Sequence, residues 1–272
     1  MAWENDLTAF RAYGPALQET GERAFGYDIW TKYNTTEPVV EARYEGELNP
    51  DMKAKIAELG KTDPKAAQEL YRSVSYHVDH GNGLDCYKVG PTLGGGTTAL
   101  MAGDTIVYPY CYATQEILDN GPLRFTVKLV YNPLVVKGDS TIIETRIITL
   151  DAGSYCNKTV VSYTNLKETM PLAVGIVLHE PDGAIVADAA NGYMTYVDPT
   201  DNAGGDNGKI CVGAAFPTLV KEAKAVLFPE KEKKELRGGA DGHVLAISEY
   251  EPGADFTYYW GVAWSKDRKS VV

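Results

Sequence analysis

The residues best suited to chemistry are concentrated in one stretch, residues 76–96, which is dense in both titratable side chains and glycines. Histidine can take up a proton near pH 7, and glycine permits unusual backbone angles and a close approach of a ligand. A loop of this composition is a candidate functional site. The alternative is a glycine-rich connection whose polar groups simply face water. The candidates are Tyr76, His77, Asp79, His80, Asp85, Tyr87 and Lys88.

The string His77-Val78-Asp79-His80 places three possible metal ligands within four residues. On a strand, His77 and Asp79 would lie on the same face. The spacing matches no zinc-protease motif, and residues 90–96 are no phosphate-binding loop, because no Gly-Lys-Ser/Thr follows them. We therefore expect neither a metal ion nor a cofactor.

Three further candidates lie downstream. His179 lies at the end of a predicted strand, 172–179, on the same face as two small residues, Ala173 and Gly175, which would leave room for a ligand above that face. The alternative is a histidine that hydrogen-bonds to a neighbouring loop. Tyr193 and Tyr196 could stack on a sugar ring or could be ordinary aromatic residues at a rim.

Several function classes are excluded or disfavoured. The net charge of −11, with no stripe of Lys and Arg to offset it, excludes nucleic acid as a partner. The longest apolar runs are far too short to span a membrane. No Gly-x-Ser-x-Gly elbow is present, which argues against that class of serine hydrolase. An acidic protein can still bind an acidic sugar through a few local cations.

Strand patterns dominate the rest of the chain. Residues 123–131 alternate apolar and polar side chains, as a half-buried antiparallel strand does. Similar runs occur at 141–150, 159–164, 172–179, 243–250 and 256–264. Their spacing and the turn residues between them are typical of a sandwich or barrel. We predict an all-β fold with minor α content, a large antiparallel β-sandwich that occupies residues 1–272 as one domain.

Helical patterns are fewer. Asp63 and Pro64 form a helix start that leads into residues 65–72, and residues 50–59 form a weaker candidate. Residues 217–227 are a third candidate. The charged run 230–235 is predicted to be a solvated loop or a helix end.

Neither the cysteines nor the first residues assign a compartment. The four cysteines are scattered without a C-x-x-C pair, so a zinc ribbon or a thioredoxin-type motif is excluded. We expect most of them to be buried thiols, although one or two disulfides are possible. No signal peptide is visible, so the chain is either cytoplasmic or has lost a leader.

Several strings together resemble domain-of-unknown-function family 4861, whose members occur in bacterial polysaccharide-degradation gene clusters. The resemblance spans nearly the whole chain, and it is most specific at residues 76–90. It implies a galactose-mutarotase-like supersandwich, an acidic oligosaccharide as substrate, and a periplasmic or extracellular location. The strings are Trp3-Glu4-Asn5-Asp6, Tyr13-Gly14-Pro15-Ala16, Gly21-Glu22-Arg23-Ala24, residues 76–90, residues 149–154 and residues 175–180.

The resemblance also implies dehydration or lysis at a non-reducing-end uronate, which yields a 4,5-unsaturated sugar. Such a β-elimination needs a cation for the carboxylate, a base for the C5 proton and an acid for the oxygen that leaves C4. Arg23 or Lys88 could hold the carboxylate, and His77 or His80 could be the base. Tyr87 or the other histidine could be the acid. Substrate-binding roles are expected for Asp79, Asp85, His179, Tyr193 and Tyr196.

Two other functions stay open on the sequence. One is a glycoside hydrolase of acidic oligosaccharides, for which Asp79, Asp85 and Glu180 are candidate carboxylates. The other is a sandwich that binds carbohydrate without catalysis. The sequence assigns no oligomeric state.

Overall fold

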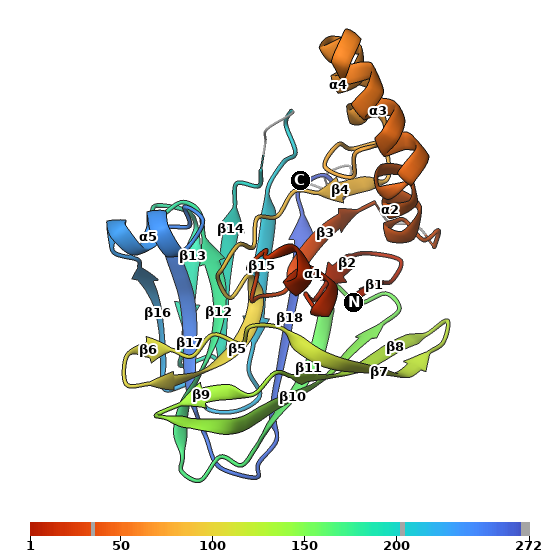
Figure 1. Cartoon of the computed structure of the whole chain (residues 1–272). Helices are drawn as coiled ribbons and strands as arrows, with labels where there is room; N and C mark the ends of the chain where they lie inside the picture. The colour runs from red at the N-terminus through yellow and green to blue at the C-terminus, as the bar shows by residue number, and fades with distance from the viewer. Residues whose placement is uncertain (34–35, 202–204, 268–272) are drawn as a thin grey trace.

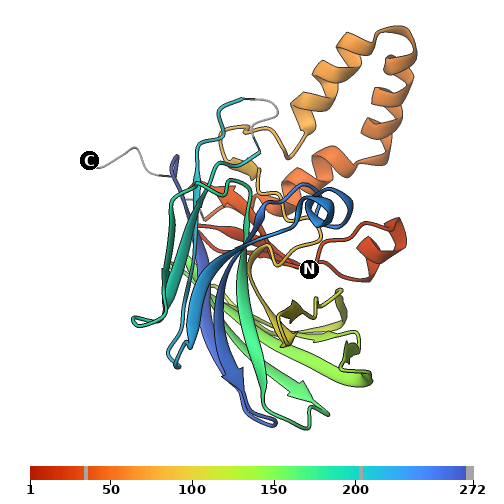
Figure 2. The same cartoon turned by 90° about the vertical axis from the view of Figure 1, so that its left-hand side faces the viewer.

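Figure 1 shows the computed structural model of the chain, which describes residues 1–33, 36–201 and 205–267. Strands make up 45% of the structure and helices 18%, so the all-β prediction with minor helix is confirmed. Two large antiparallel sheets face each other, and a smaller sheet lies at one end of them with a group of helices (Figures 1 and 2).

The larger sheet has nine strands in the order β13-β14-β15-β18-β11-β10-β8-β7, with β9 paired to β10. The sequence pattern predicts that every second side chain of a strand is buried. In β18 this holds, since Tyr258, Trp260, Val262 and Trp264 are all buried. The strands are β7 (Tyr112–Asn120), β8 (Arg124–Tyr131), β9 (Leu134–Val136), β10 (Asp139–Asp151), β11 (Cys156–Thr164), β13 (Ile185–Asp188), β14 (Tyr193–Asp198), β15 (Ile210–Ala215) and β18 (Phe256–Trp264).

The second sheet has five strands, β16 (Glu222–Leu227), β17 (Gly242–Tyr250), β12 (Met170–Leu178), β5 (Gly95–Ala102) and β6 (Thr105–Ile106), in that order. The predicted helix at 217–227 is wrong, because residues 222–227 form the edge strand β16. Glu, Ala and Lys favour helices, but the ladder with β17 outweighs that preference. The charged run that follows is the helix α5 (Glu230–Leu236) rather than a loop.

The small sheet pairs β1 (Ala2–Glu4), β2 (Ala9–Arg11), β3 (Asp28–Lys32) and β4 (Gly83–Asp85) in chain order, and α1 (Pro15–Thr20) lies between β2 and β3. The Trp3–Asp6 string fastens this sheet to the large one. The Asn5 amide donates to the carbonyls of Asp151 and Ser154, both at 2.7 Å. The Trp3 indole donates to Asn157 at 2.8 Å. These residues carry part of the family resemblance, and their role here is to hold the two sheets together.

The helices α2 (Val40–Leu48), α3 (Pro50–Thr62) and α4 (Pro64–Val74) project beyond the sheets (Figures 1 and 2). The side chains of Asn49 and Asp63 accept hydrogen bonds from the backbone at the starts of α3 and α4, and a proline follows each. The helices predicted at 50–59 and 63–72 are confirmed. Among the helices that the structure describes, none is long and apolar enough to cross a membrane.

A buried ion pair lies in the space between the large sheets. Arg146 donates to Glu144 at 2.6 Å, and both side chains are fully buried. The same guanidinium donates to the Tyr131 hydroxyl and to the carbonyl of Thr98. A buried charge pair needs such additional hydrogen bonds to offset its desolvation.

All four cysteines are free thiols. Cys86 and Cys111 are buried, Cys211 is half-buried and Cys156 is exposed. Burial raises the pKa of the Cys86 thiol to about 12. At neutral pH this thiol is therefore protonated and unreactive.

Candidate functional site

Four of the residues predicted from the sequence line one cleft of about 470 Å³, a size ordinary for a small-ligand site. The cleft lies where β2 and the segment after β4 meet the loop that follows β14. The four residues are His77, Asp85, Tyr87 and Lys88.

His77 is exposed, and a backbone carbonyl fixes its tautomer. Its Nδ1 lies 3.0 Å from the carbonyl oxygen of Asp85. A carbonyl can only accept, so Nδ1 carries the hydrogen and donates it. In the neutral ring, the lone pair is then on Nε2, where it is available to take a proton.

Asp85 is buried and takes part in a network that the sequence did not reveal. Arg11 and Asp28 are directly opposite each other on β2 and β3, and Arg11 pairs with both Asp28 and Asp85. Burial raises the pKa of both carboxyls, and the neighbouring Asp28 charge adds to the shift of Asp85, while Arg11 opposes it. Burial also disfavours the Arg11 charge, but the carboxylates outweigh it and raise the pKa of Arg11.

Tyr13 also lines the cleft, and its hydroxyl is held by Arg11, whose Nη2 donates to it at 3.2 Å. Arg11 also donates to the Tyr44 hydroxyl at 2.8 Å. Burial, together with the charge of Asp28, raises the pKa of Tyr13 well above its usual range. The phenol is therefore protonated at neutral pH, and its own hydrogen can be donated to a ligand.

Asp85 supports both sides of the cleft. Its carbonyl orients His77, and its carboxyl holds Arg11, which in turn holds Tyr13. Arg11 and Tyr13 were missed because they are far from Asp85 along the chain, Arg11 by 74 positions. The one available signal was their spacing, since residues two apart on an extended segment share a face.

Lys88 and Tyr87 contribute differently to the cleft. Lys88 is exposed, and within 1–33, 36–201 and 205–267 no carboxylate pairs with it. The Tyr87 hydroxyl is buried without a hydrogen-bond partner among the described residues. Burial and the nearby Asp198 raise the pKa of Tyr87 well above its usual range. Lys88 is thus available to an anion, whereas the Tyr87 hydroxyl belongs to the interior.

The other predicted residues of the N-terminal half do not line this cleft. His80 bonds to the carbonyl of Ser75, and Asp79 accepts from the backbone of Gly81 and Gly83. Residues 77–82 form an irregular loop rather than a strand, so His77 and Asp79 share no strand face. Arg23 is exposed in the loop after α1 and lies outside the cleft, although its neighbour Glu22 lines it.

His179 forms a pair with a buried carboxylate, since its Nδ1 lies 2.6 Å from Asp198. Its ring lies 6.2 Å from that of Tyr87. The room predicted above Gly175 is absent, because a Cβ there would lie 2.4 Å from the side chain of Leu93. The space that the small residues leave is therefore filled by the protein itself.

The two downstream tyrosines differ in environment. Tyr196 is fully buried, and its hydroxyl accepts hydrogen bonds from the backbone of His179 and Glu180. Tyr193 is exposed on β14, which lies between β13 and β15. Neither lines the cleft that contains His77.

Gly94, from the glycine-rich stretch, and Gly26 opposite it serve close packing rather than ligand approach. A Cβ on Gly26 would lie 2.1 Å from the backbone of Leu93, and one on Gly94 would lie 2.4 Å from the carbonyl of Tyr27. Gly94 also has a positive φ of 53°. These residues hold the segment from β4 to β5 against the loop before β3.

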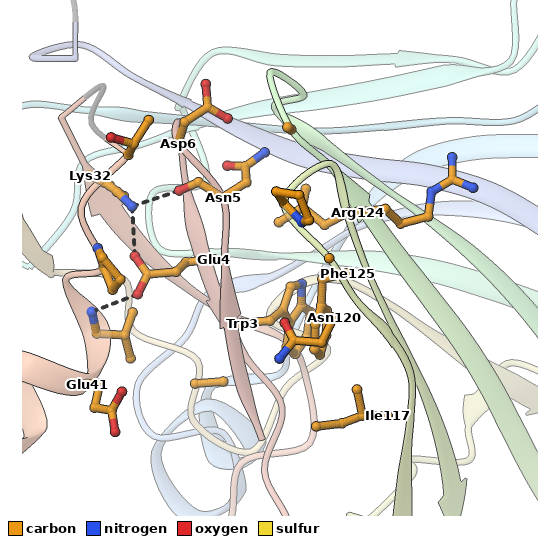
Figure 3. Close-up of a pocket in the computed structure, with 18 of the residues that line it drawn as sticks. Trp3, Glu4, Asn5, Asp6, Lys32, Glu41, Ile117, Asn120, Arg124 and Phe125 are labelled. Atoms are coloured by element: carbon orange, nitrogen blue, oxygen red, sulfur yellow. Dashed lines mark hydrogen bonds and ion pairs between the residues drawn. The ribbon is translucent and has the colours of Figure 1, made fainter.

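A larger cavity, about 900 Å³, lies between β1, the start of α2 and the β7–β8 hairpin (Figure 3). Two of its charged groups are already paired. Glu4 accepts from Lys32 at 2.8 Å and from the backbone at the start of α2. Arg124 pairs with Asp151 at 2.6 Å. No histidine lines this cavity, so it is the poorer candidate for proton transfer.

A metal site is equally poorly supported by the side-chain arrangement. Within the part of the chain that the structure describes, no three or more His, Cys, Asp or Glu side chains converge to hold a metal ion.

A family model for a domain of unknown function, DUF4861, matches residues 1–271. The chain belongs to this family. One relative of this DUF4861 chain, Uncharacterized protein P7 of Formosa agariphila, is 27% identical over 201 residues. That match covers 71% of the present chain and 44% of the relative, so the chain spans less than half of the relative's length.

Solved structures similar to this DUF4861 chain include a GH36 α-galactosidase of Geobacillus stearothermophilus. In complex with 1-deoxygalactonojirimycin it has a TM-score of 0.39 and 12% identity, over 97% of this chain and 41% of that one. In complex with raffinose the TM-score is 0.39 and the identity 11%, over 97% and 40%.

Proposed function

We propose that this DUF4861 protein is a carbon–oxygen lyase that acts, outside the cytoplasm, on oligosaccharides with a uronate at the non-reducing end. The observation that carries the proposal is one cleft lined by His77 with its Nε2 lone pair, by the protonated Tyr13 hydroxyl and by Lys88, which has no carboxylate partner among the described residues. These are the base, the acid and the cation that elimination requires. The family resemblance adds the substrate class.

In the proposed reaction, Lys88 binds the uronate carboxylate and stabilises the enolate-like charge that develops when the C5 proton leaves. His77 Nε2 takes that proton. The electron pair of the C5–H bond forms the C4=C5 double bond, and the C4–O bond breaks with its pair on oxygen. Tyr13 donates its proton to that oxygen. The leaving group is water in a dehydratase and a sugar hydroxyl in a polysaccharide lyase.

The assay is ultraviolet absorbance of the conjugated product from a panel of glucuronate- and iduronate-terminated oligosaccharides, with mass spectrometry of the products. His77→Gln should lower turnover by about 10²–10⁴, and Lys88→Met by about 10²–10³. His80→Gln, the same change outside the cleft, should retain turnover. Lys65→Met on α4 is the matched control for Lys88. Equal losses in His77→Gln and His80→Gln would contradict the assignment of the base.

A glycoside hydrolase is the second candidate, because Glu22 and Asp85 both line the cleft. Burial raises the pKa of Asp85, as a general acid in a hydrolase requires. Saturated products with a water added, and no absorbance, would replace the lyase by this hydrolase. Tight binding of the panel without any product would leave a carbohydrate-binding protein.

A further inference from the structure

Another cavity, of about 460 Å³, lies on the five-stranded sheet, on the face turned away from the nine-stranded sheet. It extends from the edge strand β16 to the opposite edge strand β6, and α5 closes one side. Its floor is apolar, formed by Met101 and Leu245, which are buried.

His243 places one polar group in this apolar wall. Its side chain is 1% exposed, and its Nε2 accepts a hydrogen bond from the backbone of Leu93 at 3.0 Å. Burial lowers the pKa of His243 to about 3, so the ring is neutral and its hydrogen is on Nδ1. No residue in the described ranges accepts from Nδ1. This nitrogen is not among the fully buried side-chain atoms that lack a partner, so a ligand in the cavity can accept from it.

Aromatic rings surround the histidine. The ring of Phe228 lies 4.9 Å from that of His243, and the ring of Tyr108 lies 6.1 Å from it. A line of rings leads away from the histidine, from Tyr108 through Phe25 to Tyr110. The ring centroid of Phe25 lies 5.4 Å from that of Tyr108 and 6.1 Å from that of Tyr110, which is 39% exposed. The Arg237 guanidinium covers one face of Tyr108, at 4.0 Å from the ring centroid. Aromatic rings beside a hydrogen-bond donor suit a ring that has apolar C–H faces and hydroxyl edges.

The cavity is next to the cleft that contains His77. Gly90 lines the cleft, and Arg237, which lines the cavity, donates to the carbonyl of Pro91 at 3.0 Å. The two spaces therefore lie on opposite sides of one segment of chain. Phe25 follows Glu22, which lines the cleft, by three positions, so the aromatic line begins close to the rim of the cleft.

Charge distinguishes the two spaces. In the cavity, Arg237 is paired with Glu232 at 2.7 Å, and Lys224 is paired with Glu222 at 2.9 Å. In the cleft, Lys88 has no carboxylate partner among the described residues. An anionic sugar is therefore favoured in the cleft, and an uncharged one in the cavity.

We infer that this cavity and the rings of Phe25, Tyr108 and Tyr110 form a second sugar subsite, which binds a neutral pyranose unit of the same oligosaccharide. The buried His243 donor would bond a hydroxyl or ring oxygen of that unit. The identity of the oligosaccharide rests on the proposed function, whereas binding of a neutral sugar here does not depend on the reaction. A substrate longer than a disaccharide is then preferred.

Affinity for two lengths of substrate tests the inference. The probes are saturated glucuronate-terminated disaccharides and tetrasaccharides of hyaluronan and chondroitin, titrated calorimetrically into the slow variant His77→Gln. The tetrasaccharide should bind about three- to tenfold more tightly than its disaccharide, the range expected for one aromatic contact. Phe228→Ala and the exposed Tyr110→Ala should each remove most of that gain.

Tyr259→Ala is the matched control, because Tyr259 is 41% exposed on β18 and lines neither space. A gain that persists in Phe228→Ala and Tyr110→Ala, or equal or absent binding of both lengths, overturns the subsite. Length-dependent binding without an unsaturated product from the wild-type chain keeps the subsite and removes the lyase. Elimination by the wild-type chain without length-dependent binding keeps the lyase and removes the subsite.

Discussion

Acidification should destabilise this protein through His243, the residue that holds the segment carrying Lys88. In the native state the pKa of His243 is lowered to about 3 by burial, and Arg237 adds to the shift. In the unfolded chain it returns to about 6.5. Its contribution to stability is therefore fully present above pH 6.5 and is lost as the pH falls from 6.5 towards 3.

The size of this effect follows from proton linkage. Relative to pH 8, the loss should be about 2 kcal/mol at pH 5 and about 4 kcal/mol at pH 3. The perturbation is His243→Gln, whose amide oxygen can still accept from the backbone of Leu93 but cannot take up a proton.

Urea unfolding at pH 8, 7, 6 and 5 gives the free energies of unfolding. The difference between wild type and His243→Gln should shrink by about 2 kcal/mol from pH 8 to pH 5. His77→Gln, which changes an exposed histidine, should leave the wild-type slope unchanged. A difference that stays constant across this range would refute the reasoning, as would a ring signal of His243 that titrates near pH 6 in the native protein.

Three further changes test the packing and the site network. For Asp85→Asn, burial raises the native pKa, so wild type should lose stability relative to this variant as pH rises above about 4, measured as the difference in urea midpoints. Gly26→Ala should lower the free energy of unfolding by about 1–3 kcal/mol or more, because the new Cβ would lie 2.1 Å from backbone. The control is Gly46→Ala in α2, whose Cβ would meet nothing closer than 3.5 Å. It should be neutral or stabilising in thermal melts. Arg146→Met should cost about 3–5 kcal/mol by leaving Glu144 buried and unpaired, and adding Glu144→Gln should recover part of that cost; no recovery would contradict a charge effect.

Strands with one buried face could be predicted because apolar and polar residues alternate along their own sequence, as in β18. β16 was not, because Glu222–Leu227 has the composition of a helix and only its ladder with β17 decides the outcome. Periodicity describes one segment at a time, so it carries no information about which strand offers a free edge.

The candidate site divides in the same way. His77, Asp85 and Lys88 could be found because they are close in sequence. Arg11 and Tyr13 could not, because β3 brings them to Asp85 through pairings that no local pattern encodes. The room expected above Gly175 failed for a related reason, since Leu93 comes from another part of the chain to fill it.

The pairing of β3 with β4 has a consequence for how the molecule folds. Lys32 and Gly83 are direct neighbours in that ladder, and the helices α2, α3 and α4 lie between them in the chain. Closing so long a loop costs more entropy than closing a tight hairpin, by about 0.6 kcal/mol for each doubling of its length. The ladder that joins the two walls of the cleft should therefore form late and open early. In hydrogen exchange, the amide of Leu84 should lose protection before the amides of β12 at the centre of the five-stranded sheet.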